Sequence, residues 1–241
     1  MTLQLNYVAH SEIGLIRKNN QDSGYVSPHL VVVADGMGGA AAGDLASAVA
    51  IDTIRKIEIP TAGEDMLEVL ALAIDQANDK IAELVESDLS LEAIRTTVSW
   101  SIFDGPNLGL AHIGDSRAYL FRDGHLERLT HDHTWVQSLV DDGKISESEA
   151  ATHPHRSLLL KVLNGQPTND PDLVLVPVVA GDRLMFCSDG VCGLLADDVI
   201  ETALQLPDLD DAADRLLAAS LHEGGIDNIT VIVADVVEAG G

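Results

Sequence analysis

The sequence has few of the features that mark secreted, membrane-spanning or zinc-binding proteins. Its 241 residues include two cysteines, Cys187 and Cys192, which form no CxxC pair and have no second pair to complete a zinc site. Cys187 lies in the apolar run RLMFCSD, so we expect a reduced core residue. No apolar run approaches the length of a membrane span, and the N-terminus lacks the basic and long apolar regions of a secretory signal.

Basic residues are also scarce. The chain has 14 Lys and Arg against 39 Asp and Glu, a formal charge of −25. A surface of this charge repels phosphate backbones, which argues against nucleic acid as a partner. The acidic residues are spread along the chain rather than gathered in a tail. They form either an ordinary solvated surface or, in part, a set of carboxylates that converge on cations.

The order of predicted elements indicates the fold class. Strands and helices come in blocks, which favours α+β layers over a regular βαβ repeat. A hydrophobic content of 46% and the absence of a Pro/Gly/Ser-rich linker or repeat predict one domain over residues 1–241, in the cytoplasm. Strands are expected at 3–9, 29–35, 96–103, 108–114, 117–121, 126–130, 173–179, 182–188 and 228–237, those from 96 to 130 as a meander. Helices are expected at 43–57, 65–87, 133–143, 146–153, 197–206 and 209–225.

Four aspartates are expected at strand ends. Asp35 in VVVADGMGG and Asp189 in LMFCSDGVCG each follow an apolar strand and precede a glycine, whereas the other three Asp-Gly pairs lie in polar surroundings typical of turns. Asp115 follows the apolar run LAHIG, and Asp227 precedes the run ITVIVAD. If these strands are neighbours, the four carboxylates meet at one edge of the sheets.

Such a group of carboxylates needs protons or cations to neutralise it. Oxygen ligands without a His/Cys cluster select Mg²⁺ or Mn²⁺ over zinc, and a glycine after the aspartate lets a backbone carbonyl approach the ion. Arg17 and Asp22 lie in the polar stretch GLIRKNNQDSGY, and an arginine beside metals suggests phosphate binding. From these residues alone, unrelated turns and an ordinary surface arginine remain the alternatives.

A family resemblance joins these motifs. The stretches RKNNQD, VADGMGG, TT before a strand, HIGDSRAYLFRDG, LTHDHTWVQSLVDDGKIS, HPHRSLLLKVL, GDRLMFCSDG and GGIDNITVIVADV occur in the order seen in metal-dependent protein phosphatases of the PPM (type-2C) family. The resemblance covers nearly the whole chain. It is strongest to the catalytic domains of bacterial serine/threonine phosphatases, particularly actinobacterial ones that oppose eukaryotic-like Ser/Thr kinases.

The resemblance implies a fold and an activity. The fold is a four-layer α-β-β-α sandwich of two antiparallel sheets flanked by helices, with a flap at about 131–165. The activity is hydrolysis of phosphoserine and phosphothreonine through a metal-activated water, using two core Mn²⁺ or Mg²⁺ ions and a third, weaker one. Partners would be phosphorylated Ser/Thr proteins, a Ser/Thr kinase among them. The protein would be a monomer in the cytoplasm, either free or as the cytoplasmic domain of a membrane-anchored protein.

The resemblance also assigns the core metal ligands. Asp35 would bridge both ions, and the carbonyl of Gly36 would bind one of them. Asp189 and Asp227 would complete the other. Asp22 would hydrogen-bond water around the ions rather than bind an ion directly.

Two further assignments concern the third ion and the substrate. Asp115 resembles a ligand of the third ion, together with Asp189 and the region of Ser157. Arg17 would hold the substrate phosphate and, with Asp35, is the residue expected to be essential for catalysis.

The sequence departs from the family pattern at four positions. Ala40 stands where the family usually has the histidine thought to assist proton transfer, and Arg95 stands for a glycine before the Thr pair. Ile226 and Gln21 are milder changes. Activity could therefore be reduced. The rival interpretations are a phosphoprotein-binding pseudophosphatase with weak or no turnover, and a purely structural acidic domain.

Overall fold

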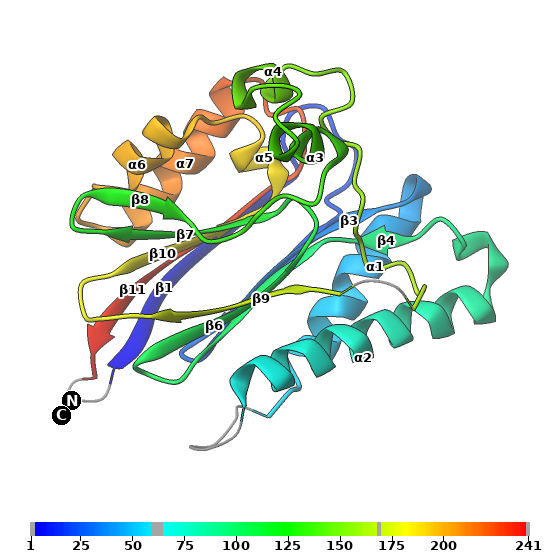
Figure 1. The fold of residues 1–241 in the computed structure, drawn as a ribbon, viewed down its shortest axis with the longest axis horizontal. Helices are drawn as coiled ribbons and strands as arrows, with labels where there is room; N and C mark the ends of the chain where they lie inside the picture. Colours follow the sequence, from blue (N-terminus) through cyan, green and yellow to red (C-terminus); the bar gives the residue numbers. More distant parts are fainter. Residues whose placement is uncertain (1–2, 59–64, 168–169, 240–241) are drawn as a thin grey trace.

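The computed structural model describes residues 3–58, 65–167 and 170–239. It has two antiparallel β-sheets packed face to face, with helices on both outer faces (Figure 1). The first sheet has the order β1 (Leu3–Glu12), β11 (Ile229–Glu238), β10 (Arg183–Cys187), β7 (Arg117–Arg122) and β8 (His125–Arg128). The second has the order β2 (Asp22–Ser27), β3 (Leu30–Met37), β5 (Val98–Phe103), β6 (Asn107–Ile113) and β9 (Asp172–Pro177), with β4 (Arg95–Thr96) beside β3. The predicted α-β-β-α sandwich is confirmed.

The helices form the outer layers and the flap. Those on the second sheet are α1 (Gly39–Ile54) and α2 (Met66–Ser87), followed by the short 3₁₀ helix η1 (Leu89–Leu91). Those on the first sheet are α6 (Asp197–Leu204) and α7 (Leu209–His222), with α5 (Asp189–Cys192) directly after β10. The flap carries α3 (Trp135–Asp141) and α4 (Glu147–Ala151). None of the helices in the described parts of the chain is long and apolar enough to cross a membrane.

The central strands are buried on both faces, which explains their unbroken apolar runs. In β3, Val31 and Val33 face the core between the sheets, whereas Val32 and Ala34 pack against the helices. The same alternation places Cys187 of β10 under α5 and α7 as a buried free thiol, as expected from the sequence.

The predicted meander is wrong in its topology. Its four strands form two hairpins in different sheets: β5 pairs with β6 in one, and β7 with β8 in the other. The chain crosses between the sheets at residues 114–116, where Gly114 has a φ of +114°. Turn residues indicate where a chain reverses, but they do not indicate which sheet receives the next strand.

Two element boundaries also differ from the prediction. Helix α1 begins at Gly39, four residues before the predicted start, and ends at Ile54. The stretch around Asp22, read as a polar segment, opens strand β2.

Candidate active site

Five aspartates gather at one end of the sandwich. Asp22 and Asp35 lie directly opposite each other on β2 and β3. Asp115 lies at the crossing between the sheets, Asp189 follows β10, and Asp227 precedes β11. Burial raises the pKa of Asp35 well above its usual value, and the negative charges of the other four aspartates raise it further. The structure thus brings together the carboxylates that the sequence singled out.

Two of these aspartates lie differently from the prediction. Asp35 does not end its strand, because β3 continues through Met37, and Asp189 is the first residue of helix α5. The glycine after Asp35 has a steric reason. A Cβ on Gly36 would lie 1.9 Å from the carbonyl oxygen of Gly43 in α1, so a side chain would push the helix away from the site.

The backbone of Asp35 is held by the Thr pair of the sequence motif. Its carbonyl accepts hydrogen bonds from Thr97 N and Thr96 Oγ1, both at 2.9 Å, and its amide donates to Thr97 Oγ1 at 3.1 Å. Arg95, which precedes the pair, is exposed in β4 opposite Met37. It therefore adds a surface charge rather than crowding the strand.

Two of the carboxylates lie deep in the site. Asp22 accepts a hydrogen bond of 2.6 Å from Ser188 Oγ, and burial raises its pKa to about 7. Burial and the charge of Asp227 raise the pKa of Asp189 to about 6. One oxygen of Asp189, Oδ1, is buried and has no hydrogen-bond partner among the described residues. An unpartnered buried carboxylate oxygen is costly unless a cation or a proton is supplied.

Arg17 reaches the cluster from the loop between β1 and β2. Its Nη2 lies 2.5 Å from Asp227 Oδ2, and its side chain is half exposed. Asn228 holds this loop: its Nδ2 donates to the carbonyls of Ile13 and Asn19, both at 3.0 Å, and its Oδ1 accepts from Gln21 N. The loop is thereby fixed beside Asp227.

Sequence reasoning missed the residues that support the aspartates. Ser188 bonds Asp22, and Asn228 fixes the Arg17 loop. The only signal for them was their position directly beside a predicted aspartate, in SD and DN. That signal does not reveal partners more than 150 residues away, since the distances of 166 and 215 positions are bridged only by the fold.

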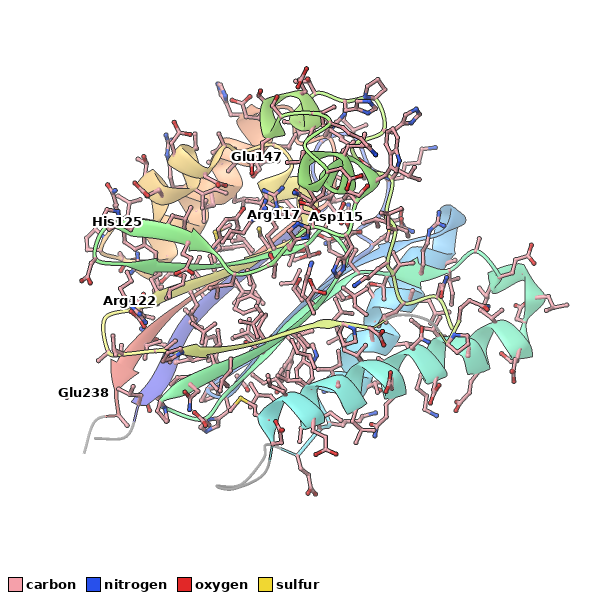
Figure 2. All side chains as sticks on the ribbon, viewed as in Figure 1. Asp115, Arg117, Arg122, His125, Glu147 and Glu238 are labelled. Atoms are coloured by element: carbon pink, nitrogen blue, oxygen red, sulfur yellow. The ribbon has the colours of Figure 1, made fainter. Side chains whose placement is uncertain are left out.

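The flap covers a cavity of about 510 Å³ beside the cluster. Figure 2 shows Asp115 and Arg117 below the flap helices, with Glu147 of α4 above them. Asp115, Asp189 and Asp227 line the cavity together with Ser157, which is exposed. Ser157 therefore faces the same space as these carboxylates. Ala40 lies in the first turn of α1, and its side chain is outside the described part of the structure.

The donor set fits a hard divalent cation. The site offers carboxylate oxygens, an unpartnered one on Asp189, and glycine backbone at Gly36, with no cysteine or histidine ligand set that would favour zinc. Within the described residues, no three His, Cys, Asp or Glu side chains are arranged to hold an ion, and Asp227 gives one oxygen to Arg17. An ion bound by these residues would therefore need water or carbonyl oxygens as additional ligands, as Mg²⁺ usually has in proteins.

Comparison with known proteins identifies the family. The family model described as "Protein phosphatase 2C" matches residues 17–223. The chain belongs to the protein phosphatase 2C family. The resemblance found in the sequence motifs is thus confirmed.

Bacterial members of the family are similar over the whole chain. The chain is 45% identical over 238 residues to the serine/threonine protein phosphatase PstP of Mycobacterium tuberculosis, covering 99% of this chain and 46% of that protein. It therefore spans about half the length of this curated relative. It is 33% identical over 232 residues to the serine/threonine phosphatase stp of Listeria welshimeri, covering 92% of each. A crystal structure of the catalytic domain of PstP in complex with two manganese ions matches with a TM-score of 0.92 and 44% identity, covering 98% of this chain and 100% of that one.

Proposed function

We propose that this chain is a metal-dependent protein phosphatase that hydrolyses phosphoserine and phosphothreonine in proteins. The observation that carries the proposal is the cluster of five aspartates with the unpartnered, buried Asp189 Oδ1. A cluster of this kind has a negative charge that its own residues do not neutralise, and buried groups with strongly raised pKa values mark functional sites. The similarity to serine/threonine phosphatases supports the substrate class.

The proposed ions are Mn²⁺ or Mg²⁺, and the two manganese ions in the PstP crystal structure support this choice. When bound, the ions would lower the pKa of a nearby water and offset the negative charge that develops at phosphorus. Asp35 would bridge the two core ions, with the Gly36 carbonyl on one and Asp189 and Asp227 on the other. Asp35 lies on β3 directly opposite Asp22 on β2, and its carboxylate is buried.

Other residues would orient water and substrate. Asp22 accepts a hydrogen bond from Ser188, and the hydroxyl of Thr230 also favours its charged form. Its carboxylate would orient water around the ions. Arg17 gives one N–H to Asp227, and a guanidinium has five, so it retains donors for two phosphate oxygens. Asp115, with Asp189 and the Ser157 region, would bind the third, weaker ion.

We also propose that residues 1–241 form one catalytic domain with the flap at about 131–165. The pairing of β1 with β11 supports this, because it joins the beginning and the end of the described chain in one sheet. The bridges Thr134–Leu159 and Thr96–Leu163 support the flap boundaries. The domain would act in the cytoplasm as a monomer on phosphorylated proteins, a Ser/Thr kinase among them.

The test is hydrolysis of a phosphothreonine peptide by EDTA-treated protein as Mn²⁺ is added back. We expect turnover only with the metal, loss of turnover in Asp35→Asn, and wild-type turnover in Asp123→Asn. Asp123 is a matched control because it lies in an exposed turn at a φ of 53°, which asparagine tolerates. Tight Mn²⁺ binding without turnover by the wild type would contradict the proposal and indicate a pseudophosphatase.

A further inference from the structure

A single buried histidine connects the turn that carries Asp115 to the flap. His133 lies just before α3, is 7% exposed, and belongs to the stretch HDHTW at the start of the flap. Its imidazole stacks on that of His112, with ring centroids 4.9 Å apart. His133 does not line the cavity and is not among the aspartates of the site, so the proposed function gives it no role.

Both polar backbone groups of Gly114 are bound by His133. The amide of His133 donates to the Gly114 carbonyl at 2.7 Å, and the amide of Gly114 donates to His133 Nδ1 at 3.1 Å. Gly114 itself has little room, since a Cβ there would lie 2.4 Å from two side-chain carbons of Thr97. Asp115 is the next residue, so the two hydrogen bonds that hold Gly114 also fix the position of the Asp115 backbone, from which the carboxylate extends.

The hydrogen bond from Gly114 fixes the tautomer of His133. Because an amide only donates, Nδ1 is the acceptor and the ring proton is on Nε2. Nε2 faces Asp172 Oδ2 at 3.1 Å, although the angle is not that of a full hydrogen bond. Burial lowers the pKa of His133, which keeps the ring neutral and Nδ1 available as an acceptor at neutral pH.

The same residue also joins the two segments at the base of the flap. The carbonyl of His133 accepts from Leu160 N at 2.8 Å, on the returning segment of the flap. Asp172, which faces Nε2, also contacts Lys161 of that segment at 3.4 Å. His133 thus links the Asp115 turn, both ends of the flap and the start of β9.

We propose that His133 is a positioning residue that couples the flap to Asp115 and thereby sets the affinity for the third ion. This rests on the proposed function, in which Asp115 binds that ion. The competing interpretation is a core histidine that only stabilises the fold. The two differ in a measurable way, because a purely structural residue affects the melting temperature without selecting one ion-binding step.

Two variants each retain one half of the imidazole. In His133→Asn the amide oxygen is attached to Cγ, as Nδ1 is, so it can still accept from Gly114 N but does not reach Asp172. In His133→Gln the amide reaches the position of Nε2 but leaves the Gly114 amide without its acceptor. The control is His131→Asn, since His131 is an exposed histidine two positions away whose ring contacts only Asp141 among the described residues.

The measurement is calorimetric titration of each metal-free variant with Mn²⁺, alongside its melting temperature and its turnover of a phosphothreonine peptide. We expect His133→Gln to weaken the weakest binding step about tenfold, the usual effect of losing one hydrogen bond, with the tight steps unchanged. We expect His133→Asn and His131→Asn to keep the wild-type isotherm.

Three outcomes would overturn the inference. They are a wild-type isotherm for His133→Gln, an equal loss in His133→Asn and His133→Gln, and a wild type that binds only two ions. Each can occur in an enzyme that still turns over, whereas failure of the proposed function would appear as absence of Mn²⁺-dependent turnover in the wild type. A melting temperature that falls in both variants without a change in the isotherms would also assign His133 a structural role alone.

Discussion

An aspartate lies at each end of strand β10, but the two aspartates differ in whether a positive side chain neutralises them. Asp182 precedes the strand, and its side chain is 1% exposed. The Nε and Nη2 atoms of Arg122 donate hydrogen bonds to its carboxylate, each at 2.6 Å, and Val179 N donates another at 2.7 Å. Asp189 follows the strand, and its buried Oδ1 has no hydrogen-bond partner in the described part of the chain. The nearest positive side chain of the site, Arg17, binds Asp227 instead.

The difference separates a carboxylate paired within the fold from one that we propose binds a metal ion. At the Asp182 end, Asp182 and Asp235 each pair with an arginine, Arg122 and Arg183 respectively, both at 2.6 Å. At the Asp189 end the acidic side chains outnumber the cations, and burial raises their pKa values. Burial alone therefore does not reveal function; burial without a partner does, because the missing charge has to come from outside the chain.

The largest predicted effect is that the same Asp→Asn substitution lowers turnover at one end of β10 and lowers stability at the other. Asp189→Asn should lower Mn²⁺-dependent turnover by about 10³-fold or more, because it removes a charge that holds the core ions. Asp182→Asn should instead lower the free energy of unfolding by about 2 kcal/mol, less than for a fully buried pair because Arg122 is one-third exposed. Turnover of a phosphothreonine peptide and urea unfolding measure the two effects. Loss of turnover in a folded Asp182→Asn protein would remove the contrast.

The second prediction concerns the pH dependence of stability without metal. The pKa values of Asp22 and Asp189 rise from 3.8 to about 7 and about 6, so the folded protein keeps protons that the unfolded chain releases. Their stabilising contribution is present at low pH and is lost as the pH rises through these values. We expect the melting temperature of the metal-free protein to fall by about 5–10 °C between pH 5.5 and 8. Scanning calorimetry in EDTA measures it.

Two controls sharpen that measurement. Saturating Mn²⁺ should abolish the fall, since the ions replace the protons as counter-charge. Asp189→Asn should reduce it in EDTA, because one member of the repelling group is neutral. A melting temperature that rises steadily with pH in EDTA would show that loss of protons from these aspartates does not destabilise the folded protein.

The third prediction tests Arg17, the arginine that binds Asp227 at the acidic end. Arg17→Ala should raise KM for a phosphothreonine peptide about tenfold while changing kcat less, because its proposed task is binding the phosphate in the ground state. Lys18→Ala, at the neighbouring exposed position, is the matched control. An unchanged KM combined with a collapse in Mn²⁺ affinity would assign Arg17 to supporting Asp227 instead.

The smallest predicted effect is a gain. Ala40→His should raise kcat a few-fold on phosphoserine or phosphothreonine peptides and little on p-nitrophenyl phosphate. Histidine titrates near neutral pH, and a general acid helps most where the leaving group is a poor one, as a serine alkoxide is. Steady-state kinetics at matched Mn²⁺ distinguish the cases. Equal gains on both substrates would indicate that the imidazole orders water rather than donating a proton.

The aspartates could be predicted because local sequence marks them. An aspartate next to a long apolar run can be recognised from the sequence alone, and Asp35, Asp115, Asp189 and Asp227 share that pattern, although Asp35 lies within β3 rather than after it. The α+β class likewise followed from the order of the predicted elements, and the four-layer arrangement followed from the family resemblance. The assignment of β7 to the other sheet did not, because the turn residues between β6 and β7 do not specify which sheet receives the next strand.

The supporting contacts were beyond sequence reasoning for a different reason. Ser188 and Asp22 are 166 positions apart, and Gly114 and His133 are 19 apart in separate elements. Many serines and histidines are compatible with a polar or a core position. Only the packed structure shows which of them completes the hydrogen bonds of a site residue.

The pairing of β1 with β11 has a mechanical consequence. Leu3 lies opposite Glu238 at one end of this ladder, and Glu12 lies opposite Ile229 at the other, close to the loops that carry Arg17 and Asp227. A force applied at Leu3 and Glu238 would therefore peel the two strands apart one pair at a time instead of shearing all ten pairs at once. The hydrogen bonds of the ladder would break first at the Leu3–Glu238 pair and last at the Glu12–Ile229 pair, next to the aspartate cluster. In an optical-trap experiment the domain should yield at low force in this geometry, with the bonds nearest the active site the last of this ladder to break.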